Sequence, residues 1–335
     1  MSAAKYFFIG GAALFGTIGL VGYFKAPSRG QSPRQPEAEV VQEIILSVKE
    51  VPKKIPMPIA SVPVPVVQPP APPPVAKEED LPDADRIGQL FALDSSKLPI
   101  VETVAYTSRV PWIQGRPAWI ADYAAHYNTS RHFIARSLNK KLDYFSQKVA
   151  PGDRFNVFKK DKNISFYLLI DLSRCRMWFY YLDLDQNERV LLKTYRVGVG
   201  RPDPKRKSGF LTPVGKYAFG DKIAIYRPGT MGFFQDEKVE MVRVFGTRWI
   251  PFEKEIDGCS EPAKGLGLHG APWVDSLENN ELTEDLSKIG AYDSDGCIRV
   301  ASQDIEEIFS IVITKPTTIE LVKDFHDAKL PGMAQ

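Results

Sequence analysis

The pattern of hydrophobic and polar positions divides the chain into segments of different structural type. An uncharged apolar run of 19 residues extends from Tyr6 to Phe24, which is just long enough to cross a bilayer core as a helix. Lys5 and Lys25 bracket this run, and no small-residue cleavage site follows it. We therefore predict an uncleaved signal anchor over residues 1–25, with a cleaved signal peptide and a buried helix as the alternatives.

Prolines recur from Val51 to Ala76 in VPKKIPMPIASVPVPVVQPPAPPPVA. Proline fixes φ and has no N–H to donate, so this run favours extended polyproline II over helix or sheet. At ~3.1 Å per residue, its length reaches up to roughly 80 Å. We predict a proline-rich, disordered stalk over residues 26–100. A linker without a defined length and a ligand for proline-binding domains are the alternatives.

The pattern of apolar and polar residues over 101–160 predicts a small α+β domain. Polar and apolar residues alternate in the first segment, helical spacing follows twice, and a short β-rich run comes after the Pro151-Gly152 turn. Thr129 or Ser130 is a plausible N-cap of the second helix. The predicted elements are strand Val101–Tyr106, helix Trp119–Tyr127, a second helix to Leu138 and strand Phe155–Phe158.

Residues 165–325 predict a mainly β domain, followed by a tail over 326–335. β-rich runs occupy Phe166–Asp171, Met177–Tyr181 and Leu191–Val199, and glycine and proline interrupt the pattern afterwards. Such spacing of short strands and turns is typical of a sandwich or barrel-like core.

Composition narrows the class of protein. The net charge of +2 lacks the strong basic excess of a nucleic-acid-binding surface, so we expect no nucleic-acid partner. The three cysteines, Cys175, Cys259 and Cys297, are too few for a disulfide scaffold, and no C-x-x-C spacing suggests a zinc or redox site. We expect no metal and no cofactor. In an exported protein an odd cysteine count leaves at least one free thiol.

The segment Ser294-Asp295-Gly296-Cys297-Ile298-Arg299 is the best candidate for a nucleophile site. A catalytic thiol needs a base, backbone N–H groups for the developing oxyanion and a glycine where substrate approaches closely. Of the four histidines, only His269 lies in a glycine-rich context, Gly265–Pro272. We predict that His269 is the base for Cys297; a purely structural histidine is the alternative.

These residues resemble the YkuD-type L,D-transpeptidases. The family pattern is a histidine followed by glycine, then S/T-H-G-C with an apolar residue and Arg or Asn, and a T-P-x-G turn upstream. Here the matching segments are His269-Gly270, Ser294–Arg299 and Thr212–Gly215. The resemblance covers about 160 residues and implies a β-sandwich-like catalytic domain that acts on bacterial cell-wall peptides.

The chain departs from the family pattern at two places. Asp295 replaces the second histidine, and a carboxylate beside the thiol raises the thiol pKa by like-charge repulsion. The interval of 28 positions from His269 to Cys297 is also longer than the pattern leads us to expect. The additional residues fall in Trp273–Tyr292, where we predict a flap with a short helix over Thr283–Ile289; an inert surface insertion is the alternative.

The resemblance implies a two-step acyl transfer without metal or cofactor. Cys297 attacks the stem peptide, His269 moves the proton, the Gly270 carbonyl orients the imidazole, and N–H groups near Gly296 and Cys297 hold the oxyanion. We expect substrate-binding or supporting roles for Ser294, Asp295, Arg299, Thr212 and Trp273. Hydrolysis of the thioester, which gives a carboxypeptidase or endopeptidase, and a non-catalytic peptidoglycan-binding anchor are the alternatives.

The small domain resembles a LysM module, which implies contact with glycan strands. The matching residues are Ile120-Ala121, Asn139 and Pro151-Gly152, although the usual opening Gly-Asp-Thr turn is absent. Together these resemblances imply a single-pass protein of the bacterial inner membrane with its catalytic domain in the periplasm or cell-wall space. Lys25, Arg29 and Arg34 oppose this orientation by the positive-inside bias, so it rests on the implied function.

Overall fold

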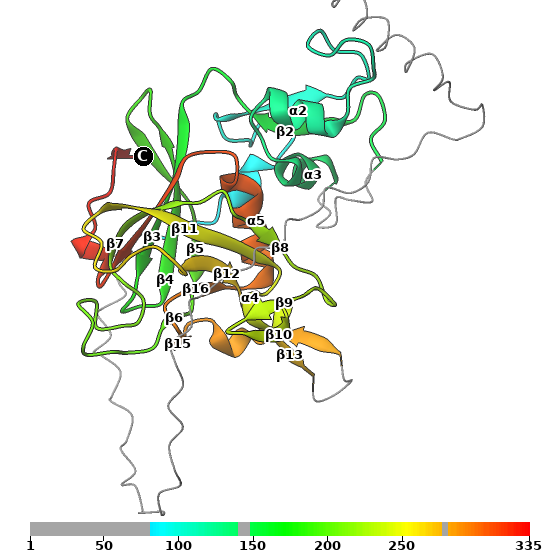
Figure 1. Cartoon of the computed structure of the whole chain (residues 1–335). Coiled ribbons are helices and arrows are strands. Elements are labelled where there is room, and N and C mark those ends of the chain that lie inside the picture. Colours follow the sequence, from blue (N-terminus) through cyan, green and yellow to red (C-terminus); the bar gives the residue numbers. More distant parts are fainter. Residues whose placement is uncertain (1–80, 140–147, 277–280) are drawn as a thin grey trace, which may run out of the picture. The chain divides into compact units, whose positions relative to one another are not determined.

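The computed structural model describes residues 81–139, 148–276 and 281–335, all of which belong to one compact unit (Figure 1). The predicted signal anchor and residues 26–80 of the predicted stalk lie outside the described residues. Within the described ranges, no helix has both the length and the apolar character needed to cross a membrane.

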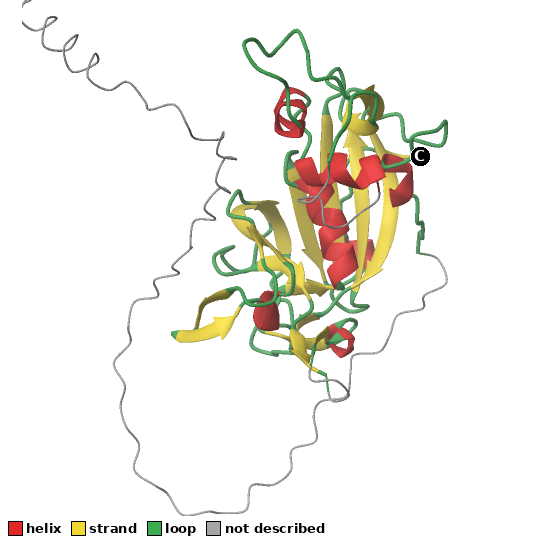
Figure 2. Cartoon of the chain, turned by 90° about the vertical axis from the view of Figure 1, so that its right-hand side faces the viewer, coloured by secondary structure: helices red, strands yellow, loops and turns green. Residues whose placement is uncertain are grey.

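A ten-stranded sheet forms the centre of the larger domain (Figures 1 and 2). Its strands follow the order β16-β12-β11-β7-β17-β3-β4-β5-β18, and β8 pairs with β11 beside this path. The strand bounds are β3 (Ile164–Asp171), β4 (Arg176–Asp183), β5 (Glu188–Arg196), β7 (Gly215–Phe219), β8 (Ala224–Ile225), β11 (Arg248–Asp257), β12 (Gly267–Gly270), β16 (Ile298–Val300), β17 (Thr317–Val322) and β18 (Met333–Ala334). The prediction of a mainly β domain is confirmed.

Strand β11 joins the two halves of this sheet. Its first residues pair with β12, where Trp249 lies opposite His269, and its later residues pair with β7. Helix α5 (Ser302–Val312) packs against β11 and β12. Its apolar residues recur at helical spacing and are buried in the main core, which explains why this segment forms an amphipathic helix. These residues are Ile305, Ile308, Phe309, Ile311 and Val312.

The small domain has the predicted order of strand, helix, helix and strand. Its elements are β1 (Val101–Ala105), α2 (Ile120–His126), α3 (Arg131–Asn139) and β2 (Arg154–Phe158). Strands β1 and β2 pair antiparallel, and Ser130 Oγ accepts the N–H of Phe133 at 3.0 Å, which confirms Ser130 as the N-cap of α3. The LysM resemblance itself stays a prediction.

The predicted boundary of the stalk at residue 100 is wrong for residues 81–100. This segment contains the helical turn η1 (Ile87–Leu90), and Ile87, Leu90, Leu98 and Ile100 are buried in the main core. Apolar side chains recur here after the proline-rich run ends, so the segment gains more by packing than by staying extended.

Two further predictions are corrected at the ends of the larger domain. Residues 326–335 are not a free tail, because β18 extends the sheet by pairing with β5. The predicted helix over Thr283–Ile289 is replaced by strand β14 (Leu282–Glu284) and one helical turn, η2 (Leu286–Lys288). The helix does not form because β14 pairs with β13 (Trp273–Asp275) and the Asp285 side chain caps the single turn by accepting the N–H of Ser287.

A second hairpin lies near the first. Strands β9 (Met231–Phe234) and β10 (Glu237–Glu240) pair antiparallel, and the short helix α4 (Val242–Phe245) contacts both β10 and β13 (Figure 1). The remaining elements are the parallel pair β6 (Val199–Gly200) and β15 (Tyr292–Ser294), and the helical turn η3 (Phe325–Asp327).

Candidate functional site

The parallel pair β12–β16 places the predicted nucleophile and base on the same face. In this pair Leu268 lies opposite Ile298, and His269 lies opposite Arg299. Leu268 and Ile298 are both fully buried in the core. Because successive side chains of a strand point to opposite faces, His269 and Arg299 project away from that core, and so does Cys297, the residue before β16. The sheet thus brings together two residues that are 28 positions apart in the sequence.

The imidazole of His269 is held in one orientation. Its Nδ1 lies 2.7 Å from the carbonyl oxygen of Gly270, and because a carbonyl only accepts, Nδ1 carries the proton of the neutral ring. The ring is buried and makes an edge contact with Phe245 at 5.3 Å between centroids. Nε2 of the neutral imidazole therefore keeps a lone pair that can accept a proton.

Burial lowers the pKa of His269 to about 4, and the positive charge of Arg299 lowers it further. Hydrogen bonding to the backbone at Gly270 and Phe245 acts in the opposite direction. The imidazole is therefore neutral near pH 7, which is the state that a general base requires.

The thiol of Cys297 is half-buried, with Sγ 3.8 Å from the carbonyl oxygen of Gly265. Burial raises its pKa to about 11, and Asp295 raises it too. A backbone hydrogen bond from Gly267 and the charge of Arg299 lower it. The thiol is therefore protonated at neutral pH, so its attack on a carbonyl requires a partner that accepts the proton.

The loop before Cys297 is tied together by Ser294. The Ser294 hydroxyl donates to the Cys297 carbonyl at 2.6 Å and accepts the Gly296 N–H at 3.2 Å. Gly296 has a φ of 122°, and a Cβ there would lie 3.0 Å from the Leu211 carbonyl oxygen, so only glycine fits without strain. This geometry corrects one expectation: the Gly296 N–H is already used inside the loop.

Asp295 faces a cation outside the loop. Its carboxylate forms an ion pair with Arg201, and the two side chains are 66% and 54% exposed. The like-charge effect on the neighbouring thiol is present, but desolvation is the larger cause of the raised pKa of Cys297.

Arg299 is fixed on both sides. Its backbone exchanges hydrogen bonds with Gly198 at 2.8 and 2.9 Å, and its guanidinium lies 3.3 Å from Asp293 Oδ2. The Nε atom is buried and has no hydrogen-bond partner among the described residues. Arg299 therefore supports the loop and keeps one donor available beside His269.

Thr212 and Trp273 take supporting positions. Thr212 is fully buried, and its hydroxyl accepts the N–H of Gly200 at 2.7 Å, which ties the T-P-x-G turn to β6. Trp273 Nε1 donates to Ser302 Oγ at 3.2 Å, which links β13 to α5.

A pocket of about 380 Å³ adjoins the Cys297 loop. Leu211 and Leu266 line it, and these two residues also bracket Gly296. The polar part of the wall carries charges of both signs, from Arg206, Lys264, Glu261 and Asp295. A ligand with both carboxylate and ammonium groups would match this wall.

The sequence patterns did not identify several residues that contact His269 or Cys297. Phe245 and Trp249 flank the imidazole, and the Gly265 carbonyl faces the thiol. The one available signal was the glycine content of this region, since a Cβ at Gly246 would lie 2.7 Å from Gly270 backbone atoms. Cys259, whose Asp-Gly-Cys context is similar, contacts the Lys216 carbonyl of β7 instead, at 3.0 Å.

A mainly β domain that presents a thiol and a neutral, oriented imidazole on adjacent strands has the groups that thiol-dependent acyl transfer requires. Residues 165–321 match the family model of the YkuD domain, described as the L,D-transpeptidase catalytic domain. This part of the chain therefore matches the YkuD-type catalytic domain, whose family acts in peptidoglycan metabolism.

Three solved structures show a distant similarity. Bd1075 of Bdellovibrio bacteriovorus is 15% identical over 48% of each chain, with a TM-score of 0.31. Pgp2 of Campylobacter jejuni, described as a helical cell shape determining protein, is 18% identical over 52% of this chain and 54% of its own, with a TM-score of 0.31. L,D-transpeptidase 1 of Mycobacterium tuberculosis is 13% identical over 50% of this chain and 70% of its own, with a TM-score of 0.23.

The match spans about half the length of the first two of these structures. The comparison with curated protein sequences gives no match. The family model therefore carries the assignment, and it does so for residues 165–321.

Proposed function

We propose that this protein is an L,D-transpeptidase that cross-links peptidoglycan, with Cys297 as nucleophile and His269 as general base. The observation that carries the proposal is the shared face of β12 and β16, which presents both residues within a YkuD-type domain. A pocket whose wall includes Asp295 adjoins the Cys297 loop. No step of this chemistry requires a metal ion or a cofactor.

In the first step the Cys297 sulfur attacks the carbonyl carbon that follows the diamino acid of a tetrapeptide stem. His269 Nε2 accepts the thiol proton and then gives it to the leaving D-alanine amine, so that a thioester and free D-alanine result. In the second step the amine of another stem attacks the thioester, His269 accepts a proton from this amine, and the thiol is regenerated. The new amide bond is the cross-link.

The directions of the two pKa shifts favour a neutral thiol and imidazole over a resident thiolate–imidazolium ion pair. A thiol pKa of about 11 and an imidazole pKa of about 4 keep both groups neutral in the free enzyme. Proton transfer therefore accompanies the attack on the carbonyl. Because Ser294 uses the Gly296 N–H, we assign the oxyanion to the Cys297 N–H, a contact worth about 3 kcal/mol per donor in related chemistry.

The donor stem fits the pocket beside the Cys297 loop. A stem peptide carries carboxylates and an ammonium group, and the pocket wall offers Arg206 and Lys264 together with Glu261 and Asp295. Leu211 and Leu266 would contact the apolar part of the stem peptide between its charged groups.

The N-terminal part of the chain supports a place at the cell envelope. The apolar run Tyr6–Phe24 would anchor the protein in the inner membrane, and the stalk and LysM-like domain would hold the enzyme near glycan strands. In this proposal the catalytic domain faces the periplasm or cell-wall space.

Covalent labelling by a carbapenem tests the nucleophile. Mass spectrometry of the protein after incubation with the drug is expected to show one adduct, which Cys297→Ala abolishes. Cys259→Ala is the matched control, since it removes the thiol of the similar Asp-Gly-Cys segment and is expected to keep the adduct. An adduct that persists in Cys297→Ala, or no adduct in the wild-type protein, would rule out the proposed nucleophile.

The products formed from a disaccharide-tetrapeptide test the second step. A transpeptidase releases D-alanine and forms a cross-linked dimer, whereas tripeptide and D-alanine without dimer would identify the carboxypeptidase alternative. Retained binding to peptidoglycan without either product would identify the non-catalytic anchor.

A further inference from the structure

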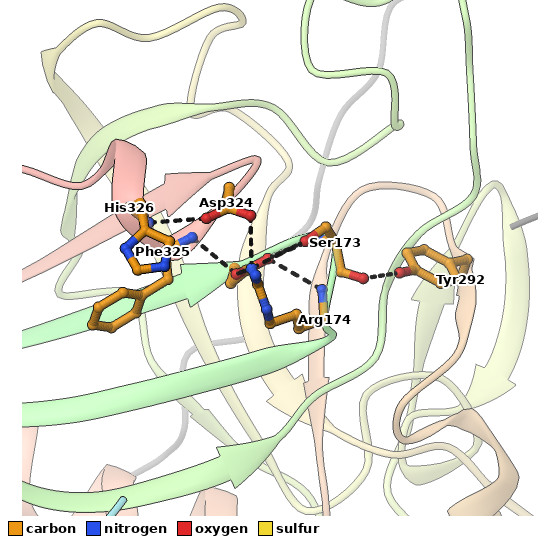
Figure 3. Close-up of polar contacts among 7 residues, drawn as sticks. Ser173, Arg174, Tyr292, Asp324, Phe325 and His326 are labelled. Carbon is orange, nitrogen blue, oxygen red and sulfur yellow. Dashed lines mark hydrogen bonds and ion pairs between the residues drawn. The ribbon is translucent and has the colours of Figure 1, made fainter. Parts of the chain in front are cut away.

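A buried polar network stabilises the turn between β3 and β4 (Figure 3). Asp171, the last residue of β3, is fully buried and accepts the N–H and the hydroxyl of Ser173, both at 2.8 Å. Its carboxylate also pairs with Arg174 and accepts the Phe325 N–H at 2.9 Å. Arg174 in turn lies 2.8 Å from Asp324, which follows β17. The turn is thus tied to two strands by charged groups that are mostly shielded from water.

This turn contacts the strand that leads to Cys297 through the hydroxyl of Tyr292, which lies beside Cys175. The Tyr292 hydroxyl donates to the Ser173 carbonyl at 2.6 Å, between residues 119 positions apart (Figure 3). The Tyr292 ring stacks on Phe210 with centroids 5.3 Å apart and an interplanar angle of 13°. Burial and the neighbouring Cys175 raise the pKa of Tyr292, so the hydroxyl stays protonated and remains a donor.

The strand β15 connects this contact to Cys297. Tyr292 begins β15 and Ser294 ends it, and Ser294 binds the Cys297 carbonyl and the Gly296 N–H. The same short strand is therefore fixed by Tyr292 at its start and ties the nucleophile loop at its end. On the other side of Cys297, strand β16 pairs directly with β12, which carries His269. The loop with Cys297 is therefore held at one end by β16 and at the other by β15.

We propose that Tyr292 is a positioning residue: its hydroxyl transmits the rigidity of the Asp171–Arg174–Asp324 network through β15 to the loop that carries Cys297. The proposal rests on the proposed function for its catalytic consequence, but its structural part stands on the hydrogen bonds alone. Small displacements between reacting groups cost large factors in rate, so loss of this support acts on the chemical step.

Tyr292→Phe tests the proposal because it removes only the hydroxyl and keeps the ring that stacks on Phe210. Tyr167→Phe is the matched control. Tyr167 donates its own 2.6 Å hydrogen bond, to Glu320 on β17, and belongs to a separate hydrophobic cluster on the sheet. Both variants of the full-length protein are compared by thermal unfolding, by kcat and KM for D-alanine release, and by hydrogen exchange.

In Tyr292→Phe we expect kcat to fall on the order of 10-fold with little change in KM, and the amides of residues 293–299 to exchange faster. Tyr167→Phe is expected to lower stability without changing either readout. Equal losses of kcat in the two variants would overturn the proposal, and so would unchanged exchange over residues 293–299 in Tyr292→Phe.

Two further measurements keep the outcome decisive. Should the wild-type protein neither release D-alanine nor take a carbapenem adduct, the proposed function fails, and the exchange comparison still decides whether Tyr292 holds the loop. Should Tyr292→Phe fail to fold, Asp324→Asn weakens the network from its half-exposed end. It is expected to change the same readouts in the same direction by a smaller factor.

Discussion

The surroundings of Cys297 and the surroundings of His269 are held by different kinds of contact. On the Cys297 side, a buried network with Asp171 and Arg174 at its centre supports β15 and the nucleophile loop. On the His269 side, Phe245 contacts the imidazole from α4, and Arg243 on the same helix pairs with Glu240 and Asp275 at the surface. The charges at the first side are shielded from water, whereas those at the second are screened by it.

The hairpins near His269 also expose apolar side chains. Met231, Phe233 and Val274 are 46%, 66% and 42% exposed. A short hairpin with little buried area opens at low cost, whereas a strand tied to a buried ion network does not. We therefore expect the loop that carries Cys297 to open less readily than the two hairpins near His269.

The largest expected effect is on turnover and comes from His269→Ala. Loss of the general base is expected to slow acylation by 10²- to 10⁴-fold, on the scale of such catalysis, because the Cys297 thiol is protonated at rest. Single-turnover acylation by a carbapenem measures the effect. A rate that recovers as pH rises toward the thiol pKa would support the role, and an unchanged rate at pH 7 would exclude it.

The second-largest effect is expected on the free energy of unfolding and comes from Asp171→Ala, on the Cys297 side. Asp171→Ala leaves Arg174 buried with Asp324 as its remaining ion-pair partner, and breaking such a pair costs about 3–5 kcal/mol of unfolding free energy. Urea denaturation followed by tryptophan fluorescence gives the value. A loss below about 1 kcal/mol would show that the network on the Cys297 side is no stronger than a surface ion pair.

As the pH falls, protonation of shielded histidines is expected to be the first cause of lost stability. Burial lowers the pKa of His269 to about 4 and that of His132 to about 3, and Arg248, Arg131 and Arg136 add to the second shift. The unfolded chain binds these protons more readily than the folded protein does. The free energy of unfolding therefore falls as pH drops below 6.5, by up to about 1.4 kcal/mol per pH unit for each histidine. Thermal unfolding from pH 7.5 to pH 4.5 tests this slope.

The carboxylate of Asp324, in the network with Asp171 and Arg174, provides the contrast in the same pH scan. Hydrogen bonds from His326 and Arg174 hold the pKa of Asp324 below its ordinary value of 3.8, so its contribution is lost only at lower pH. His132→Gln is expected to flatten the slope between pH 6.5 and pH 4.5. A slope that this variant leaves intact would contradict a role for His132.

The smallest effect is expected from Arg243→Ala. Arg243 is 38% exposed and its partner Asp275 is 61% exposed, so solvent screens the pair. Its removal is expected to lower stability only slightly, and less in high salt than in low salt. A loss as large as that of Asp171→Ala would mean that both sides of the site are equally rigid.

The sequence alone predicted the class of domain and proposed Cys297 and His269 as the reacting pair. Glycines around His269 and Cys297 mark places of close approach, and β-rich runs predict the strands, because both signals are local. The N-cap at Ser130 and the order of elements in the small domain were predictable for the same reason.

Only the tertiary structure decided what surrounds the pair. The Gly265 carbonyl faces the thiol, Asp295 pairs with Arg201 and Tyr292 donates to Ser173, across separations of 32, 94 and 119 positions. Such contacts depend on strand order and register, which periodicity in the sequence does not encode. The same holds for residues 81–100, whose apolar side chains pack on a sheet formed by residues far along the chain.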